Sequence, residues 1–344
     1  MIGILTYNRA INYGAVLQSF ALKEFLSRYD NCDIINYKNA HIEKVYTYQN
    51  ENLLKKTLKN LLFGERNKKF RRFTSEISTE KIYHKDELDS LAYDKIISGS
   101  DQVWNFNCSG GDDTYLLPNT IKAKKYSYAA SFGLSRIPDV QVEKFKENLS
   151  RFRYISVREK TGQDICREQL GLASEVVLDP TLLLTKSEWE SKLNIRKTKK
   201  KYVLVYAFEL NDTIRQTAKL IAKQYDLPIY TVPTRFKDSF EKTMRNAGPK
   251  EWVELFYNAA FVVTDSFHGT AFSINFNKPF YSFAKNERAS RIVDLLNLLK
   301  INERLISDAS EVCSESEIDY VRVNELLDVE REQSISFIEK IIND

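Results

Sequence analysis

A histidine between a predicted strand and a predicted helix is the residue in this sequence best suited to transfer a proton. His268 is one of three histidines, and it lies between the apolar run at residues 261–264 and a second apolar stretch. A helix that starts there presents unpaired N–H groups and a positive dipole end to an anion. Imidazole titrates near neutral pH, which suits a general acid. The alternative is a histidine that caps the helix or is satisfied in the core. Its placement favours a functional role, with Ser266 and Gly269 of the same turn as further anion-binding residues.

Basic residues follow two other predicted strands. After the run at residues 280–283 come Lys285, Arg288 and Arg291. Arg158 follows the run at residues 154–157. A guanidinium group can hold a carboxylate or phosphate through two parallel hydrogen bonds, so a small, multiply charged anion is the expected ligand. The alternatives are that the first three cations simply face water and that Arg158 forms an ion pair with Glu159 or another nearby acid.

Two polar loops follow predicted strands nearer the N-terminus. The loop at residues 8–14 lacks the G-x-G-x-x-G spacing of a dinucleotide site. The loop at residues 98–105 contains Asp101, whose carboxylate can accept hydrogen bonds from a sugar hydroxyl or act as a base. Further candidate ligand contacts in these loops are Asn8, Asn12, Gly14 and, by stacking on a sugar ring, Trp104. A helix N-cap is the alternative for Asn12, and a place in the core is the alternative for Trp104.

The elements that must position these residues follow from the pattern of apolar runs. Runs that read as strands alternate with amphipathic segments, which is typical of parallel sheets covered by helices. Strands are predicted at residues 2–6, 33–37, 95–98, 125–129, 154–157, 175–178, 202–207, 228–232, 261–264 and 280–283. Ligands of such sheets bind at the carboxyl ends of the strands, which is where the candidate residues lie. We therefore predict an α/β protein with two Rossmann-like domains facing a cleft.

A short charged segment at residues 196–201 is predicted to be a solvated connection between the domains. The first domain is then expected at residues 1–185, where it contributes Arg158. The second is expected at residues 200–310, where it carries His268 and Lys285, and residues 311–344 form a helical tail.

Composition excludes several classes of protein. The 344 residues include 51 basic and 47 acidic side chains, a net charge of +4, which does not indicate a nucleic-acid binder. The four cysteines are scattered and show no metal-ligand spacing, so no metal site is expected. No apolar stretch approaches the roughly 20 residues of a membrane-spanning helix, and the N-terminus reads as a strand rather than a signal peptide. We expect a soluble, cytoplasmic protein.

One basic stretch is compatible with contact to the inner face of a membrane or to a lipid diphosphate. Between residues 55 and 72, eight lysines and arginines alternate with leucines and phenylalanines. Such a pattern is found in helices that lie on anionic lipid. A solvated helical face is the alternative and the preferred interpretation.

The ordered set of motifs resembles the polysaccharide pyruvyl transferase family. The resemblance rests on residues 12–18, 98–105, 156–159, 178–181 and 265–269, and it extends from residue 1 to about residue 300. It implies a fold like that of GT-B glycosyltransferases, with the first domain on the acceptor side and the second on the donor side. It also implies transfer of pyruvate from phosphoenolpyruvate to two hydroxyls of one sugar, as a cyclic ketal, with release of phosphate. No cofactor is implied beyond phosphoenolpyruvate as co-substrate.

Several site residues follow from the resemblance. Arg158, His268 and Lys285 match donor-binding and catalytic positions, with His268 as general acid. Many members have an arginine where this chain has Ser266, so anion binding is expected to draw on Arg288 or Arg291. Asp101 is the candidate base for the acceptor hydroxyl, and the acceptor is a saccharide that can be polyprenyl-diphosphate-linked.

Two rival interpretations remain open. One is a GT-B glycosyltransferase that uses a nucleotide sugar. The other is a non-catalytic carbohydrate-binding component of polysaccharide assembly. Under the pyruvyl transfer hypothesis His268, Arg158 and Lys285 are expected to converge on one pocket.

Overall fold

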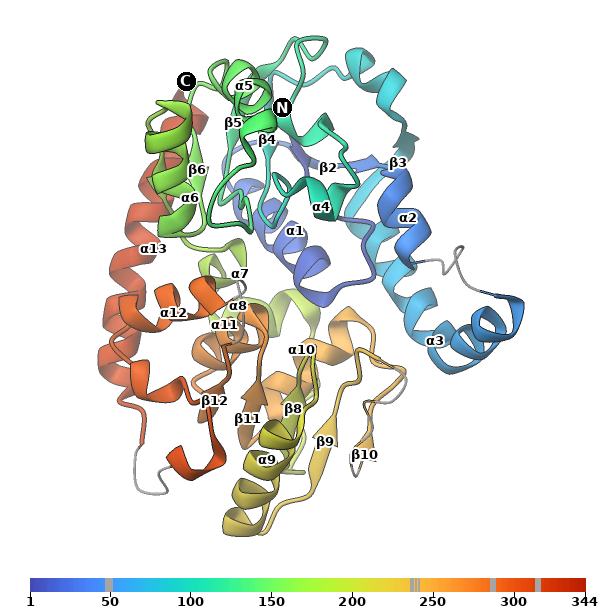
Figure 1. Cartoon of the computed structure of the whole chain (residues 1–344), viewed down its shortest axis with the longest axis vertical. Coiled ribbons are helices and arrows are strands. Elements are labelled where there is room, and N and C mark those ends of the chain that lie inside the picture. Colours follow the sequence, from blue (N-terminus) through green and yellow to red (C-terminus); the bar gives the residue numbers. More distant parts are fainter. Residues whose placement is uncertain (47–51, 236–237, 239, 241, 285–288, 313–316) are drawn as a thin grey trace. The chain divides into compact units, whose positions relative to one another are not determined.

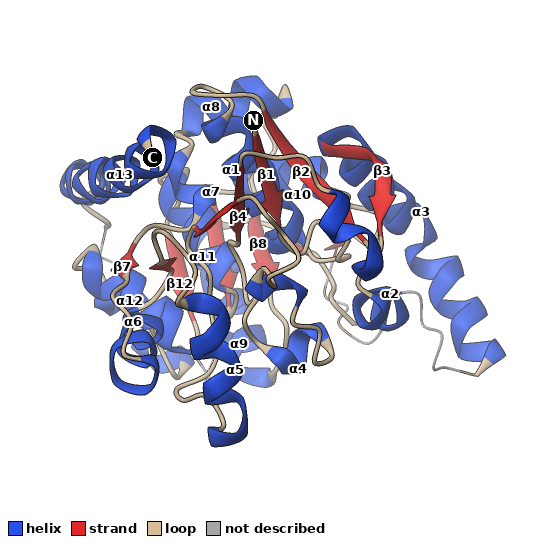
Figure 2. Cartoon of the chain, turned by 90° about the horizontal axis from the view of Figure 1, so that it is seen from above, coloured by secondary structure: helices blue, strands red, loops and turns tan. Residues whose placement is uncertain are grey.

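The chain folds into two compact α/β units, each with its own parallel sheet of five strands. The computed structural model describes residues 1–46, 52–235, 238, 240, 242–284, 289–312 and 317–344. Helices surround the strands (Figures 1 and 2). Each unit has the architecture that the alternation of apolar runs predicts, so the prediction of two Rossmann-like domains is confirmed.

The units are not continuous stretches of the sequence. Unit 1 contains residues 1–56, 70–183 and 330–344, whereas unit 2 contains residues 57–69 and 184–329. Two long helices are divided between them, α3 (Leu53–Ile77) and α13 (Tyr320–Asn343). The predicted domains were continuous ranges, so they did not anticipate that residues 57–69 belong to unit 2 or that residues 330–344 belong to unit 1. The segment 196–201, expected to connect the domains, lies inside unit 2.

The sheet of unit 1 has the strand order β3-β2-β1-β4-β5. Its strands are β1 (Ile2–Leu5), β2 (Cys32–Tyr37), β3 (Ser78–Tyr83), β4 (Lys95–Ser98) and β5 (Lys124–Ser127), and β6 (Ser156–Val157) pairs with β7 (Glu175–Val176). Leu5 lies opposite Ser98, so the loops after β1 and β4 leave the sheet at the same edge. The two polar loops are thereby brought together.

Helices cover the sheet of unit 1. They are α1 (Tyr13–Leu26), α2 (Ala40–Tyr46), α4 (Phe106–Ser109), α5 (Asp139–Leu149), α6 (Lys160–Ile165) and α7 (Pro180–Leu183), with one π-helical turn at Cys166–Leu170. Strands β1, β2 and β4 are buried at nearly every position, as expected where helices cover both faces of a parallel sheet. The core of this unit includes Leu5, Ile35, Ile96, Trp104 and Val157.

Unit 2 repeats the plan with the strand order β10-β9-β8-β11-β12. Its strands are β8 (Val203–Tyr206), β9 (Ile229–Thr231), β10 (Lys242–Thr243), β11 (Phe261–Thr264) and β12 (Phe280–Ser282). Its helices are α8 (Lys186–Leu193), α9 (Asp212–Tyr225), α10 (Pro249–Asn258), α11 (Phe267–Asn275) and α12 (Ala289–Leu298). Thr264 lies between Tyr206 and Ser282, so three strands end at one edge.

Helix α9 shows how the local sequence sets these elements. Asn211 caps it by accepting a hydrogen bond from the Ile214 N–H, and the helix stops at Asp226 in the left-handed conformation. Ile214, Ala218 and Ile221 recur at helical spacing and are buried against the sheet. The helix expected at residues 212–225 is therefore observed with the predicted buried face.

Candidate functional site

The turn that carries His268 connects β11 to α11 in the middle of the sheet of unit 2. Ser266 caps α11, since its hydroxyl accepts a hydrogen bond from the Gly269 N–H at 3.3 Å. A Cβ atom on Gly269 would lie 2.2 Å from Oγ1 of Thr264, so only glycine fits against the strand. The Thr270 and Ser282 hydroxyls are hydrogen-bonded at 2.7 Å. The turn is therefore held rigidly at the carboxyl ends of β11 and β12.

Asp265 fixes the same turn to the neighbouring strand. Its carboxylate accepts hydrogen bonds from the N–H groups of Phe208, at 2.6 Å, and Glu209, at 3.0 Å, in the loop after β8. The acid thus ties together two strand ends that are 57 residues apart in the chain. These hydrogen bonds give Asp265 a structural role in the motif, and no catalytic role is needed to explain its presence.

His268 lies in the first turn of α11 and is 8% exposed. Its ring packs edge-on against Phe267, with the ring centroids 5.2 Å apart. The guanidinium carbon of Arg291, on α12, lies 6.0 Å from the centroid of the same Phe267 ring. Two of the predicted site residues therefore approach one aromatic side chain at the N-terminus of α11. Lys285 and Arg288 fall outside the described residues.

In unit 1, Arg158 is the centre of a buried ion cluster. Its guanidinium lies 2.8 Å from Asp179, 3.6 Å from Asp101 and 3.8 Å from Glu159. Burial alone lowers the pKa of Arg158, but the nearby carboxylates of Asp179, Asp101 and Glu159 outweigh it and raise that pKa. The alternative of an ion pair with Glu159 or another acid is thus observed, with Asp179 as the nearest partner. The role of Arg158 in donor binding stays a prediction.

The cluster around Arg158 brings together several of the sequence motifs of unit 1. Asp101, Arg158 and Asp179 come from three separate motifs at residues 98–105, 156–159 and 178–181. Residues 12–18 join them through Gln18, whose amide oxygen accepts a hydrogen bond from the Ser100 N–H at 3.1 Å. Gln18 also donates to the Thr6 hydroxyl at 2.8 Å. Residues from four of the five motifs are therefore linked by contacts within unit 1.

A pocket of about 340 Å³ opens beside this cluster, and one predicted polar residue from each of the two loops lines it. Asn12 and Asp101 line it, together with His41, Gln102 and Cys108. Asp101 adopts a φ of 76°, which is uncommon for any residue but glycine, and its carboxylate accepts a hydrogen bond from the Gln102 N–H. The side chain of Asn12 caps α1, as its alternative predicted. Its place in the pocket wall leaves it available for a ligand as well.

The remaining acceptor candidates have different surroundings. Trp104 is 1% exposed, donates a hydrogen bond to the Tyr115 carbonyl and packs on Phe132 with centroids 5.0 Å apart. The core alternative therefore applies to Trp104, because its ring offers no face to a sugar. Asn8 and Gly14 are both buried, and neither lines the pocket.

The basic stretch at residues 55–72 belongs to α3. Its phenylalanines, Phe63 and Phe70, are buried, so much of its apolar pattern serves the core. Leu58 and Leu61 are 46% and 81% exposed. Nearby on the helix, Lys68 pairs with Glu65 and Arg72 with Glu76, which reduces the excess of positive charge. Membrane contact through this stretch stays a prediction, and no helix within the described residues is both long and apolar enough to cross a bilayer.

Some residues of the site were not identified by sequence reasoning. His41 was not singled out from the sequence, yet it lines the unit 1 pocket with Cys108. Asp179 was noted only as part of a motif, although it is the strongest partner of Arg158. Its position directly after a predicted strand was the signal that could have marked it. No group of three or more histidine, cysteine or acidic side chains suited to a metal occurs among the described residues.

Comparison with known proteins gives one family and one fold. The family model described as "Polysaccharide pyruvyl transferase" matches residues 12–286. No curated protein matches the sequence. Among solved structures, the UDP-GlcNAc 2-epimerase of Methanocaldococcus jannaschii, in complex with UDP-GlcNAc and UDP, has 12% identity and a TM-score of 0.51 over 99% of this chain and 98% of that one. The E. coli heptosyltransferase WaaC with ADP has 11% identity and a TM-score of 0.41 over 85% and 90%. The fold is of the GT-B type.

Proposed function

The chain belongs to the polysaccharide pyruvyl transferase family, and we propose that it transfers pyruvate from phosphoenolpyruvate to a saccharide as a cyclic ketal. The observation that carries this proposal is the family match over residues 12–286, which contains the His268 turn and the Arg158 cluster. The acceptor is a surface polysaccharide precursor, either free or linked to a polyprenyl diphosphate.

The proposed reaction begins with a proton transfer. His268 protonates the methylene carbon of phosphoenolpyruvate, which makes C2 electrophilic, and one sugar hydroxyl attacks C2. The C2–O bond to phosphate then breaks, and a second hydroxyl of the same sugar closes the ketal. Of the two hydroxyl protons, one balances the proton gained by the methyl group and the other leaves with phosphate. Each turnover therefore releases one inorganic phosphate.

The proposal assigns donor binding to the N-terminus of α11 and to the cations near it. The first turn of α11 offers backbone N–H groups and a positive dipole end. Arg291 supplies a positive charge near His268, through the shared contact with Phe267. We assign Ser266, Gly269, Lys285 and Arg288 to the same anion, and Arg158 as a further donor-binding residue. A bound phosphate would also favour the protonated form of His268.

Acceptor binding is assigned to the pocket of unit 1. Asn12 and Asp101 lie in its wall with groups that can accept hydrogen bonds from hydroxyls. We assign Asp101 as the base that receives a hydroxyl proton. Asn8 and Gly14 contribute through the shape of the loop rather than through the pocket wall.

Ligand-dependent thermal unfolding tests the donor. Purified protein is heated with phosphoenolpyruvate, with UDP-glucose, with UDP-N-acetylglucosamine or with inorganic phosphate. A ligand present at 100 times its Kd adds about 2.7 kcal/mol of stability, so phosphoenolpyruvate is expected to raise Tm by several degrees. Stabilisation by the nucleotide sugars alone would instead favour the glycosyltransferase interpretation. Stabilisation by none of the four would favour a non-catalytic protein.

A further inference from the structure

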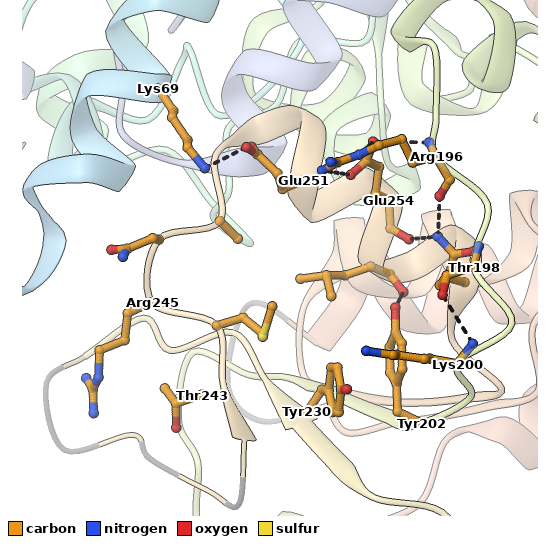
Figure 3. Close-up of a pocket in the computed structure, with 15 residues that line it drawn as sticks. Lys69, Arg196, Thr198, Lys200, Tyr202, Tyr230, Thr243, Arg245, Glu251 and Glu254 are labelled. Atoms are coloured by element: carbon orange, nitrogen blue, oxygen red, sulfur yellow. Dashed lines mark hydrogen bonds and ion pairs between the residues drawn. The ribbon is translucent and has the colours of Figure 1, made fainter.

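One cavity of unit 2 is separate from the His268 turn. It has a volume of about 740 Å³, and no residue of the turn at 265–270 lines it (Figure 3). One wall is a stripe of α10 at positions i, i+3, i+4 and i+7, formed by Glu251, Glu254, Leu255 and Asn258. Seven residues of helix span roughly 10 Å, so the cavity is an elongated groove rather than a compact hole. Its size is within the range of small-molecule and oligomer sites.

An extended segment closes one end of this groove. Arg196, Thr198 and Lys200 line the cavity, as alternate residues of an extended chain do when they face one side. The segment is fixed to α10, because the Arg196 N–H donates to Glu254 at 3.1 Å and the Thr198 N–H to Asn258 at 2.9 Å. The groove is therefore a built feature, and the segment 196–201 is part of its wall.

Two tyrosines that line the groove stack on each other. Tyr202 and Tyr230 are stacked with centroids 4.2 Å apart and an interplanar angle of 3°. Lys242 lies over the Tyr230 ring, with Nζ 4.8 Å from the centroid, and donates to the phenol oxygen at 3.2 Å. Tyr202 thus covers one face of the Tyr230 ring. The Tyr230 phenol oxygen lines the groove as a group that can accept a hydrogen bond from a ligand hydroxyl.

The charges of the groove favour an anion. The two carboxylates of the α10 wall are already paired, Glu251 with Lys69 at 2.6 Å and Glu254 with Arg196 at 3.2 Å. Among the described residues, no carboxylate lies within ion-pair distance of Lys200, whose side chain extends into the cavity in Figure 3. Thr243 and Asn246 add a hydroxyl and an amide to the lining. The groove thus combines hydroxyl and amide groups with an uncompensated ammonium.

We infer that this groove binds an acidic saccharide chain, that is, several hydroxyl-rich sugar rings of which at least one carries a carboxylate. The carboxylate contacts Lys200, and the ring hydroxyls contact the phenol, hydroxyl and amide groups along the wall. The inference rests on the proposed function only in taking a saccharide as the class of ligand. It places the rest of the polymer, rather than the reacting sugar, on α10.

Calorimetric titration with defined oligosaccharides tests the inference. Tetragalacturonate carries a carboxylate on each ring, maltotetraose carries none, and UDP represents a nucleotide. Tetragalacturonate is expected to bind saturably and more tightly than maltotetraose, and its binding should weaken as salt is added. Lys200→Gln should weaken it by about tenfold or more, the size expected for one charge-assisted hydrogen bond. Lys223→Gln, at an exposed lysine on α9, is the matched control and should bind as the wild type does.

Four results would overturn the inference: no saturable binding of tetragalacturonate, equal binding of maltotetraose, no effect of Lys200→Gln, or a Lys200-dependent preference for UDP. Thermal unfolding of each variant checks that the fold is kept. His268→Ala separates this inference from the proposed function, because it should bind tetragalacturonate normally. If pyruvyl transfer is never detected while binding persists, only the proposed function fails. If transfer is detected without binding in the groove, only the inference fails.

Discussion

At the scale of single residues, the buried cluster around Arg158 sets the strongest constraint on the site. One guanidinium is surrounded by Asp179, Asp101 and Glu159, so the cluster contains more acidic than basic side chains. Such surroundings fix the side chain of Arg158 and hold Asp101 beside the pocket of unit 1. A donor anion can gain from Arg158 only in competition with these carboxylates. Positioning of Asp101 is a role that the geometry supports directly.

Replacing Arg158 by methionine should destabilise the protein strongly. Removal of one partner leaves buried carboxylates without their counter-charge, a change that typically costs about 3–5 kcal/mol. Urea unfolding measures this loss, and Asp179→Asn combined with Arg158→Met should lose less than the sum of the single changes. A loss below about 1 kcal/mol, the range of a surface pair, would show that the cluster is not a buried network.

The thiol of Cys108 should report on the pocket of unit 1. Cys108 is exposed and lines the pocket, whereas Cys32 and Cys166 are buried, which raises their pKa values to about 12 and about 11. Among the cysteines that the structure describes, iodoacetamide at pH 8 should therefore alkylate Cys108 far faster than Cys32 and Cys166, because the thiolate is the reactive form. Peptide mapping by mass spectrometry checks this. An acceptor saccharide should slow the labelling of Cys108, and equal labelling of all three would contradict the described burial.

At the scale of elements, the junction of β11 and α11 shows how closely packing specifies the turn. Gly269→Ala would place a methyl group 2.2 Å from the Thr264 hydroxyl. Overpacking of this kind typically costs about 1–3 kcal/mol. Gly64→Ala, within α3, is the control, since its new methyl group would meet nothing within 4 Å and should stabilise the helix by roughly 0.5–1 kcal/mol. Denaturant unfolding should therefore show opposite signs, and equal effects would contradict the packing described.

Lys278, between α11 and β12, should make the free energy of unfolding depend on pH in the alkaline range. Burial, with the nearby charges of Lys186 and Lys201, lowers the pKa of Lys278 from 10.5 to about 8. Between these two values the unfolded chain binds a proton that the folded chain has lost, so the free energy of unfolding rises with pH. Lys278→Met should increase stability at pH 7 and reduce that rise. Urea unfolding from pH 7 to 10 measures this rise. If the free energy of unfolding rises equally in the wild type and in Lys278→Met, groups other than Lys278 cause the rise.

The elements were predictable from sequence to different degrees. Strands β4 and β11 match their predicted bounds, and the adjacent apolar residues that marked each of them are buried. Strands β3 and β10 were not predicted, since they are edge strands that contain no buried residue and no apolar run. The His268 turn followed from its place after a strand. The Arg158–Asp179 contact and the α10 groove did not, because their residues come from segments that only the tertiary fold brings together.

At the scale of the whole molecule, the family match and the GT-B type of fold both agree with the sequence analysis. The predicted membrane contact of residues 55–72 is still to be tested. Exposed Leu58 and Leu61 on α3 are the residues through which the predicted membrane contact would act. Their partial burial in lipid would add to the attraction between the basic residues and an anionic surface. Binding to vesicles with anionic lipid that is lost in Leu61→Ser would support this contact. Absence of binding at low salt would contradict it and leave the solvated helical face as the interpretation.

The central claim is that the protein moves pyruvate from phosphoenolpyruvate to a sugar, with His268 as proton donor. The most direct measurement is proton NMR of the saccharide after incubation with phosphoenolpyruvate and a panel of nitrophenyl glycosides, with phosphate measured in parallel. The account predicts a new ketal methyl signal in equal amount to released phosphate. It also predicts that His268→Gln lowers the rate by roughly 10²–10⁴-fold, the contribution of a general acid, while phosphoenolpyruvate still raises Tm. Phosphate release without a ketal, or a ketal formed at the wild-type rate by His268→Gln, would contradict the account.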